Sequence, residues 1–262
     1  MIGVIILIIA GSLIALNSGK KNVGYKSELE NVDKILVDAD VSNIVAVTGD
    51  SKMNIEYTSQ KSLFGNSKID IVYEKDRAII KVKAKWINIV TKRGELVLNL
   101  PPRILEQVQI KTRNGNIDVK NLSEVNRLSL SSRVGNINVD SFKGESLNIE
   151  AKNGSMNIGA VDGEVNIKNR IGSLNSLNFS DIKGKNNINL SNGNVKLTLP
   201  NGLKSNEVVL NISTSNGKLI TENNILSSEN KIKRGAGQKI INGTKGDKEL
   251  NISVSVGNII IN

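Results

Sequence analysis

Basic residues recur at nearly even spacing through the middle of this 262-residue sequence, at Arg113, Arg133, Lys152 and Arg170. Each lies two residues before a glycine, and the next two equivalent positions hold Ser191 and Ser215. Cations held close together repel one another, and an anionic polymer or lipid headgroups could neutralise them. The spacing therefore indicates a candidate polyanion-binding site. A solvated surface that resists edge-to-edge aggregation is the alternative interpretation.

Carboxylates offer the other possible chemistry, and the candidates are Asp118, Asp140, Asp162 and Glu164. A glycosidase needs two carboxyl groups about 5–9.5 Å apart, and stacked repeats could provide that spacing. Three residues after each repeat glycine, however, the series reads Asp118, Asn138, Asn157, Asn175, Lys196. Since only one carboxylate occurs in that series, we expect no catalytic residue. A polysaccharide-active lyase or hydrolase remains the alternative function.

The sequence contains neither cysteine nor histidine. This absence excludes thiolate or imidazole zinc sites, Cys–His and Ser–His dyads, and disulfides. The glycine-rich calcium-binding nonapeptide is also absent from the sequence. We therefore predict no metal site and no cofactor.

The net charge is +10, from 35 Lys plus Arg against 25 Asp plus Glu. The basic residues are spread along the chain, whereas a nucleic-acid-binding protein more often concentrates them. After residue 90 the only aromatic residues are Phe142 and Phe179, which argues against platforms for base stacking. We therefore expect no nucleic-acid partner.

The basic residues belong to a repeat that is marked by a glycine, often with Asn beside it. The repeat glycines are Gly115, Gly135, Gly154, Gly172, Gly193, Gly217 and Gly257. Successive steps are 20, 19, 18, 21, 24 and 40 residues, and the last step predicts two coils. Most residues seven and five positions before the glycine and two and four after it are apolar, as in Val108, Ile110, Ile117 and Val119. The coil of Gly193 is irregular before the glycine, and that of Gly172 has Ser176 at the last of these positions. The alternation predicts two short strands that meet at a tight corner, where glycine supplies the positive φ.

A unit of about 20 residues cannot bury its apolar face alone, but stacked units can. Because the phase of the corner glycine is constant, we predict an all-β fold, a right-handed parallel β-solenoid (β-helix) of about 18–24-residue coils. An antiparallel meander would not explain that phase. Neighbouring coils would lie about 4.8 Å apart, so the four basic residues would form an outward-facing ladder.

The N-terminal part of the chain differs from the repeats. We predict a transmembrane anchor over residues 1–18, a linker over 19–29, an irregular β cap over 30–105 and the solenoid over 106–262. Met1–Leu16 is uncharged and apolar, and a cleaved signal peptide or a buried helix are the alternatives. Lysines follow this segment, and by the positive-inside rule they favour a cytoplasmic location for the rest of the chain. We nevertheless predict an extracytoplasmic body. Within the cap, Ser42 occupies the place of a corner glycine.

These features resemble those of the bacterial putative-adhesin β-strand-repeat family, which includes LiaG- and YvlB-like envelope proteins. The resemblance rests on the apolar N-terminus, on "LVLNLP" at 96–101, on "LTLP" at 197–200 and on the glycine repeats. It implies a single-pass protein of the cell membrane with a non-catalytic extracytoplasmic body that acts in adhesion, binding or stress response. The implied partners are the membrane, reached through the N-terminal helix, and an anionic envelope polymer, lipid headgroups or another envelope protein.

Overall fold

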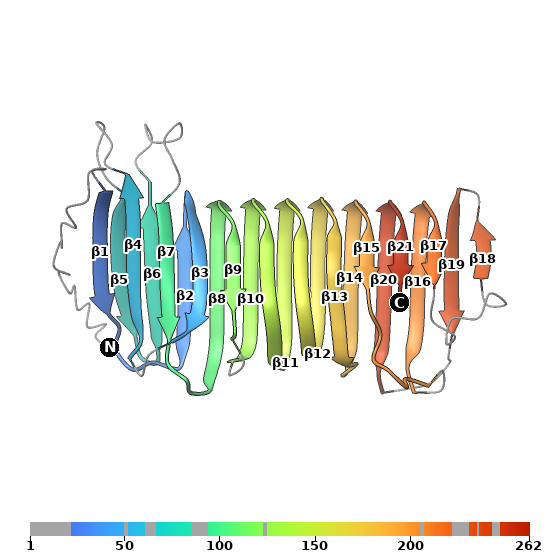
Figure 1. The fold of residues 1–262 in the computed structure, drawn as a ribbon, viewed down its shortest axis with the longest axis horizontal. Coiled ribbons are helices and arrows are strands. Elements are labelled where there is room, and N and C mark those ends of the chain that lie inside the picture. Colours follow the sequence, from blue (N-terminus) through green and yellow to red (C-terminus); the bar gives the residue numbers. More distant parts are fainter. Residues whose placement is uncertain are drawn as a thin grey trace, which may run out of the picture.

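The computed structural model describes residues 22–49, 52–60, 67–84, 94–122, 125–204, 207–221, 231–234, 236–242 and 247–262. These residues form strands, turns and bends, and none of them belongs to a helix that could cross a membrane. The predicted anchor at 1–18 lies outside the described residues. The strands stack side by side into one elongated body (Figure 1). The all-β prediction is confirmed.

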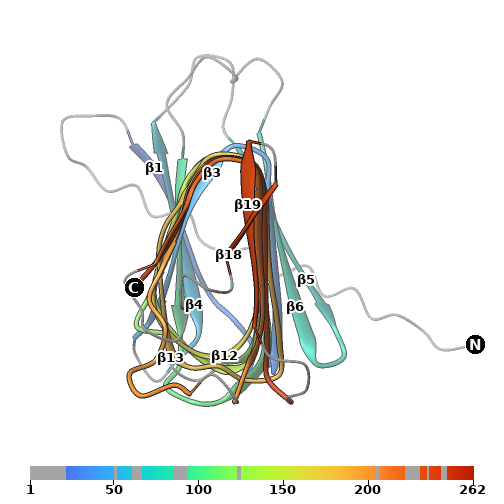
Figure 2. The ribbon, with the colours of Figure 1, turned by 90° about the vertical axis from the view of Figure 1, so that its right-hand side faces the viewer.

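Two walls run along the length of this body, and they converge toward one end of its cross-section (Figure 2). In spatial order, the first wall contains β5 (Lys68–Glu74), β6 (Arg77–Lys83), β2 (Lys34–Ala39), β8 (Leu105–Asn114), β10 (Val125–Val134), the later parts of β11 (Ile137–Asn153) and β12 (Met156–Ile171), β14 (Lys185–Asn192), β20 (Glu249–Val256), β16 (Val209–Asn216), β19 (Gly237–Asn242) and β18 (Lys231–Arg234).

The second wall is built in the same way from the strands that follow the corners. Its order is β1 (Asn22–Glu28), β4 (Asn54–Gln60), β7 (Gly94–Leu100), β3 (Ser42–Thr48), β9 (Ile117–Lys120), the first parts of β11 and β12, β13 (Leu174–Asp181), β15 (Val195–Leu197), β21 (Ile259–Ile261) and β17 (Leu219–Thr221). From β6 to β16 and from β7 to β17 all pairing is parallel, and antiparallel strands cover the ends. The predicted parallel stacking is therefore confirmed.

Alternating side chains of both walls point into one continuous apolar core. The residues that the repeat predicts as inward-facing are buried, for example Val108, Ile110, Ile117 and Val119, each at most 1% exposed. Phe142 and its equivalents close the broad end of the cross-section, where β11 and β12 continue from one wall into the next coil. The periodicity thus predicts the core correctly.

The corner glycines stack in a single row, and close approach is the reason that all seven are glycine. A Cβ atom built on any of them would lie within 3.0 Å of the corner carbonyl oxygen in the neighbouring coil. Five of the seven have φ between +129° and +158°, but Gly115 and Gly217 are not among the positive-φ residues. The prediction that the corner needs glycine for its positive φ is therefore incomplete, because the steric requirement applies at all seven corner glycines.

The N-terminal end departs from the predicted linker and cap. Asn22–Glu28, within the predicted linker, form β1 and pair with β4. Ser42 occupies a corner as predicted, but β2 and β3 form a regular parallel coil, with β6 and β7 on one side and β8 and β9 on the other. After β1, the chain therefore forms an inner coil with β2 and β3, builds the outer strands β4 to β7, and then continues on the inner side with β8.

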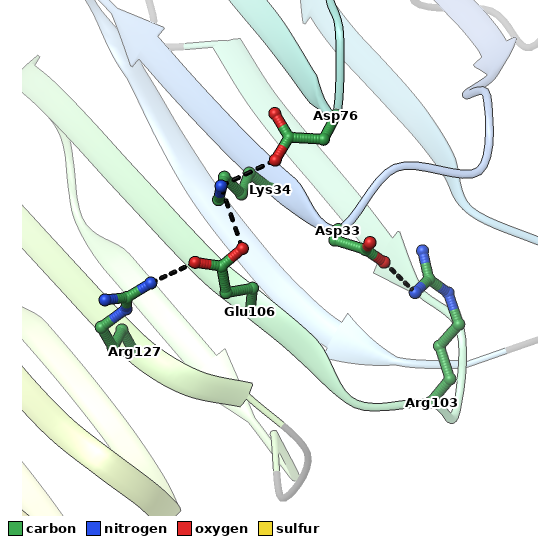
Figure 3. Close-up of polar contacts among 6 residues, drawn as sticks. All are labelled: Asp33, Lys34, Asp76, Arg103, Glu106 and Arg127. Atoms are coloured by element: carbon green, nitrogen blue, oxygen red, sulfur yellow. Dashed lines mark hydrogen bonds and ion pairs between the residues drawn. The ribbon is translucent and has the colours of Figure 1, made fainter.

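Ion pairs join the strands of this interleaved end (Figure 3). Lys34 Nζ lies 2.7 Å from Asp76 and 2.9 Å from Glu106, which also pairs with Arg127. Arg103 pairs with Asp33 at 2.6 Å. The hydrogen bond from Asp76 and then that from Glu106 raise the pKa of Lys34, and Lys34 lowers the pKa of Asp76.

The C-terminal end is interleaved as well, and here the sequence prediction is wrong. The described residues between Gly217 and Gly257 form no further coil between these two corners. Instead, β20 and β21 lie between the coil of β14 and β15 and the coil of β16 and β17. The corner of Gly257 therefore stacks on Gly193, and the corner of Gly217 stacks on Gly257. The segment between them contributes β18 and β19, which pair antiparallel at the outer end.

Two irregular coils also have a structural explanation. The pairing of β12 with β13 shifts by one residue, so that Leu177 is buried where the repeat predicts Ser176. In the coil of Gly193 a buried amide, Asn186, takes an inward position. Its oxygen accepts the Val165 N–H at 2.8 Å, and its nitrogen donates to two backbone carbonyls, so no polar atom is left unpaired.

Candidate polyanion-binding face

The structure brings the four basic residues of the repeat together on the outer face of the first wall. Arg113, Arg133, Lys152 and Arg170 lie on β8, β10, β11 and β12, which pair in parallel with equivalent residues opposite one another. All four are exposed. We call these four residues the cation ladder. Adjacent rungs are about 4.8 Å apart, where neighbouring unit charges in water repel by about 1 kcal/mol.

Acidic side chains compensate the cation ladder at one end only. Arg113 lies 3.9 Å from Asp40, which directly follows β2. Among the ion pairs of the described residues, none involves Arg133, Lys152 or Arg170. Three neighbouring cations therefore face solvent, and they can bind an anionic partner without first breaking an ion pair.

A groove of about 820 Å³ lies beside the cation ladder. Its floor is formed where β10 carries the short side chains Ser129 and Ser131 on its outer face. Longer charged side chains line it from the neighbouring strands, including Lys111 on one side and Glu150 on the other. The groove gives extended ligands a place to lie against the ladder.

A second groove of about 450 Å³ lies further along the same wall. Lys152, Lys168 and Arg170 line one side of it. The other side is uncharged, with Asn189 and Ser191 from β14 and Ser253 and Ser255 from β20. Rungs of the cation ladder therefore border both grooves.

Hydrogen-bonded side chains hold the coils in register next to the corner. The residue after each corner accepts the backbone N–H of its counterpart in the next coil. The bonds run from Asn116 to Asn43, Asn136 to Asn116, Ser155 to Asn136, Ser173 to Ser155, Asn194 to Ser173, Asn258 to Asn194 and Lys218 to Asn258, at 2.8–3.5 Å. This row fixes the backbone on which the cation ladder stands.

Buried polar side chains provide a second support that the sequence analysis missed. Three residues before the corner, Thr112, Ser132 and Thr214 donate to the corner carbonyl of a neighbouring coil, at 2.8–3.2 Å. Asn169 donates to two corner carbonyls, that of Gly154 in the neighbouring coil and that of Gly172 in its own coil. The signal that could have found them is a polar residue at a position where the repeat otherwise has an apolar one.

The four candidate catalytic carboxylates do not all come together into one site, although Asp162 and Glu164 are alternate residues on the same side of β12. Asp118 accepts a 2.6 Å hydrogen bond from Asn138, at one end of a row of amides. Asp162 pairs with Lys183 at 2.5 Å, at the broad end of the cross-section. Neither Asp140 nor Glu164 lines the two grooves. Among the described residues, no three carboxylates lie close enough to hold a metal ion.

The large groove contains its own carboxylates, but their arrangement is unfavourable for glycoside hydrolysis. Asp38 and Glu150 occupy the same column three coils apart. At about 4.8 Å per coil that separation is about 14 Å, beyond the 5–9.5 Å range of glycosidase pairs. Asp40 is closer to Asp38, but it faces the guanidinium of Arg113.

Comparison with solved structures finds bacterial proteins that are similar to this chain, and the first of those described below shows the same fold. A putative adhesin from Bacteroides fragilis is 14% identical, with 93% of this chain and 98% of that chain covered and a TM-score of 0.50. A putative cell adhesion protein from Clostridium sporogenes is 15% identical, with 92% and 99% covered and a TM-score of 0.38. A putative lipid binding protein from Parabacteroides distasonis is 16% identical, with 93% and 97% covered and a TM-score of 0.45.

No curated protein matches the sequence. The model of the Toastrack DUF4097 family matches residues 13–262, which include every described strand. This match agrees with the resemblance to a putative-adhesin β-repeat family that the sequence indicates. The chain belongs to the Toastrack DUF4097 family.

Proposed function

We propose that this protein is a non-catalytic binding module of the bacterial cell envelope, and that its ligand is an anionic polymer. The observation that carries the proposal is the cation ladder, in which exposed cations of four consecutive coils stand in register beside two grooves. Their mutual repulsion decreases when a polyanion neutralises them. Adhesion or stress sensing at the envelope would follow from such binding.

The placement in the envelope is part of the same proposal. Met1–Leu16 is long and apolar enough to act as an anchor with some adjustment of the bilayer. Structural relatives described as adhesins support a role outside the cytoplasm. We therefore propose a single-pass membrane protein with an extracytoplasmic body, whose coils wind in the right-handed sense.

Binding should depend on the ladder rather than on net charge alone. The test variant changes Arg113, Arg133, Lys152 and Arg170 to Ser, the residue that already occupies two equivalent positions. The matched control changes Lys120, Lys143, Lys196 and Lys204 to Ser, four exposed residues outside both grooves. Both variants lose the same net charge.

The probe is inorganic polyphosphate, added to the full chain in a neutral detergent. The ladder variant should bind roughly tenfold or more weakly, because exposed ion pairs contribute about 0.2–1 kcal/mol each. The control should stay close to the wild type, and all binding should weaken between low and physiological salt. Equal loss in both variants would overturn the proposal, since the ladder would then be a solvated surface.

A further inference from the structure

The outer face of the first wall changes its chemistry along the axis of the body. The coils that carry the cation ladder have charged outward residues next to the corner, whereas in the three coils beyond them outward charge is confined to the start of the strands, where Lys185 pairs with Glu249 at 3.2 Å. We call nine outward side chains between that ion pair and the corner the neutral array: Asn187, Asn189 and Ser191 on β14, Asn251, Ser253 and Ser255 on β20, and Asn211, Ser213 and Ser215 on β16. Nine neighbouring positions thus hold only amides and hydroxyls.

These side chains form a regular lattice. Neighbouring strands are about 4.8 Å apart, and alternate residues along a strand are about 6.8 Å apart. The column of Asn187, Asn251 and Asn211 is held by amide hydrogen bonds of 2.9 and 3.2 Å along the axis. The other two columns have no side-chain hydrogen bond among the contacts of the described residues. Their donors and acceptors are therefore available to a ligand.

The smaller groove crosses the boundary between the charged and the neutral coils. Lys152, Lys168 and Arg170 line its charged side, and the neutral side is formed by members of the neutral array. Glu150 also lines the groove and offers acceptor oxygens. A ligand in this groove therefore meets cations and uncharged hydrogen-bonding groups at the same time.

We infer that the ligand of this face is a polysaccharide that carries acidic groups. Sugar hydroxyls both donate and accept hydrogen bonds, as the Ser hydroxyls and the Asn amides do, and acidic substituents would pair with the cations. A simple polyanion such as polyphosphate can accept hydrogen bonds from the neutral array but has no donors for its oxygens, and a neutral glycan has no charge to pair with the cations. The inference rests on the proposed function and names the class of its ligand.

Recognition at this groove would be polar, without stacking. Beyond residue 90 the only aromatic residues are Phe142 and Phe179, and both are buried in the core. The lattice is carried by strands that are paired on both sides, so the polar groups are positioned before the ligand arrives. A long chain that contacts several coils gains from repeated weak contacts.

The test combines Asn189→Ala, Ser253→Ala and Ser255→Ala in the full chain. The matched control combines Asn178→Ala, Ser141→Ala and Ser180→Ala, which removes the same groups from outside both grooves. Circular dichroism checks that both variants keep the wild-type fold. The probes are polygalacturonate, dextran and inorganic polyphosphate.

The test variant should bind polygalacturonate roughly tenfold or more weakly than the wild type, because three hydrogen-bonding groups are lost. It should lose much less affinity for polyphosphate, which uses only the donors of the removed groups, and the control should bind both probes normally. Dextran should bind far more weakly than polygalacturonate to every variant. Undiminished binding of polygalacturonate by the test variant would overturn this inference, and the proposed function would stand if polyphosphate still required the cation ladder. Failure of the wild type to bind either polyanion would overturn both.

Discussion

The middle of the solenoid and its C-terminal end are built from the same kind of coil but in different orders. From β8 to β15 each coil stacks on the one before it in the chain. At the C-terminal end, β20 and β21 return and lie between two earlier coils. The difference shows that the repeat specifies how a coil is made, whereas contacts between coils decide where it is placed.

Side-chain contacts at the C-terminal end show what decides the placement. Lys185 pairs with Glu249 at 3.2 Å, and Lys248 pairs with Asp181 at 2.8 Å. Both pairs join the returning segment to coils that lie more than sixty residues earlier in the sequence. Asn251 adds amide hydrogen bonds to the strands on both sides of it. The returning coil thus has polar partners on β14 and on β16, and its apolar side chains are buried in the core.

Deletion of residues 249–262 should unfold the C-terminal end of the solenoid. The deletion removes five buried aliphatic side chains, Leu250, Ile252, Val254, Ile259 and Ile261. At about 1.5–3 kcal/mol each, the loss is roughly 8–15 kcal/mol as an upper bound. Because β16 rests on β20, hydrogen exchange should show that β16 and β17 lose their amide protection. Protection of β16 at the wild-type level would mean that it can stack directly on β14.

Corner substitutions should be as damaging at the C-terminal end as in the middle. Gly257→Ala and Gly154→Ala should each destabilise by about 3 kcal/mol or more, and Gly154→Val by more again, because a Cβ overlaps a backbone carbonyl. The control is Gly202→Ala, where φ is +78° but no atom lies within 4 Å of the new methyl group. It should destabilise by about 1 kcal/mol.

Chemical denaturation measures the free energy of unfolding of these corner variants. Gly115→Ala separates the effect of close approach from that of positive φ, since Gly115 lies outside the positive-φ range but approaches Ser42 closely. It should rank with Gly154→Ala. If Gly115→Ala instead destabilises the protein less than Gly202→Ala does, then backbone conformation, and not close approach, is the reason that the corners need glycine.

Acid should weaken the ion pairs that hold the returning coil. The hydrogen bond from Lys248 lowers the pKa of Asp181, and the hydrogen bond from Lys185, followed by that from Asn251, lowers the pKa of Glu249. A carboxyl group with a lowered pKa in the folded state stabilises the fold above its unfolded pKa, which is 3.8 for Asp and 4.5 for Glu. That contribution disappears as the pH falls through the folded pKa.

Melting curves of the wild type and of the double variant Lys185→Gln, Lys248→Gln test this small effect. The wild type should melt slightly higher at pH 7, and the difference should shrink as the pH falls below about 4.5. The middle of the solenoid provides the control, because Lys143→Gln should change the melting temperature little at either pH. A difference that grows toward low pH would contradict this assignment of the ion pairs.

Local features of the sequence predict most of the coil. Alternation identifies inward residues such as Val108 and Ile110, and the constant phase of the glycines identifies the corners. The same phase places the cation ladder on one outer face. Polar residues that point inward, such as Ser132 and Asn186, are not predicted by the pattern, because the backbone groups that they satisfy belong to other coils.

The order of the coils could not be predicted for a related physical reason. The 40-residue step before Gly257 is consistent with two coils or with a detour and a return, and the returning coil carries the same apolar pattern as its neighbours. The ion partners Asp181 and Lys248 are far apart in sequence, and nothing in their spacing pairs them. The neutral array could not be predicted for the same reason, since it forms only when β20 lies between β14 and β16.

Engineered disulfides give the most direct test of the interleaved order, because the chain has no cysteine of its own. Asn189, Ser253 and Ser213 occupy the same outward column, and Ser253 is opposite both of the others. The double variants N189C/S253C and S213C/S253C therefore place the two cysteines about 4.8 Å apart, within reach of a disulfide. N189C/S213C places them two rungs apart, at about 9.6 Å, which is too far. Oxidation should cross-link the first two variants and leave the third with free thiols. A disulfide in N189C/S213C, with free thiols in N189C/S253C, would show that the coils stack in sequence order and would contradict the interleaved end.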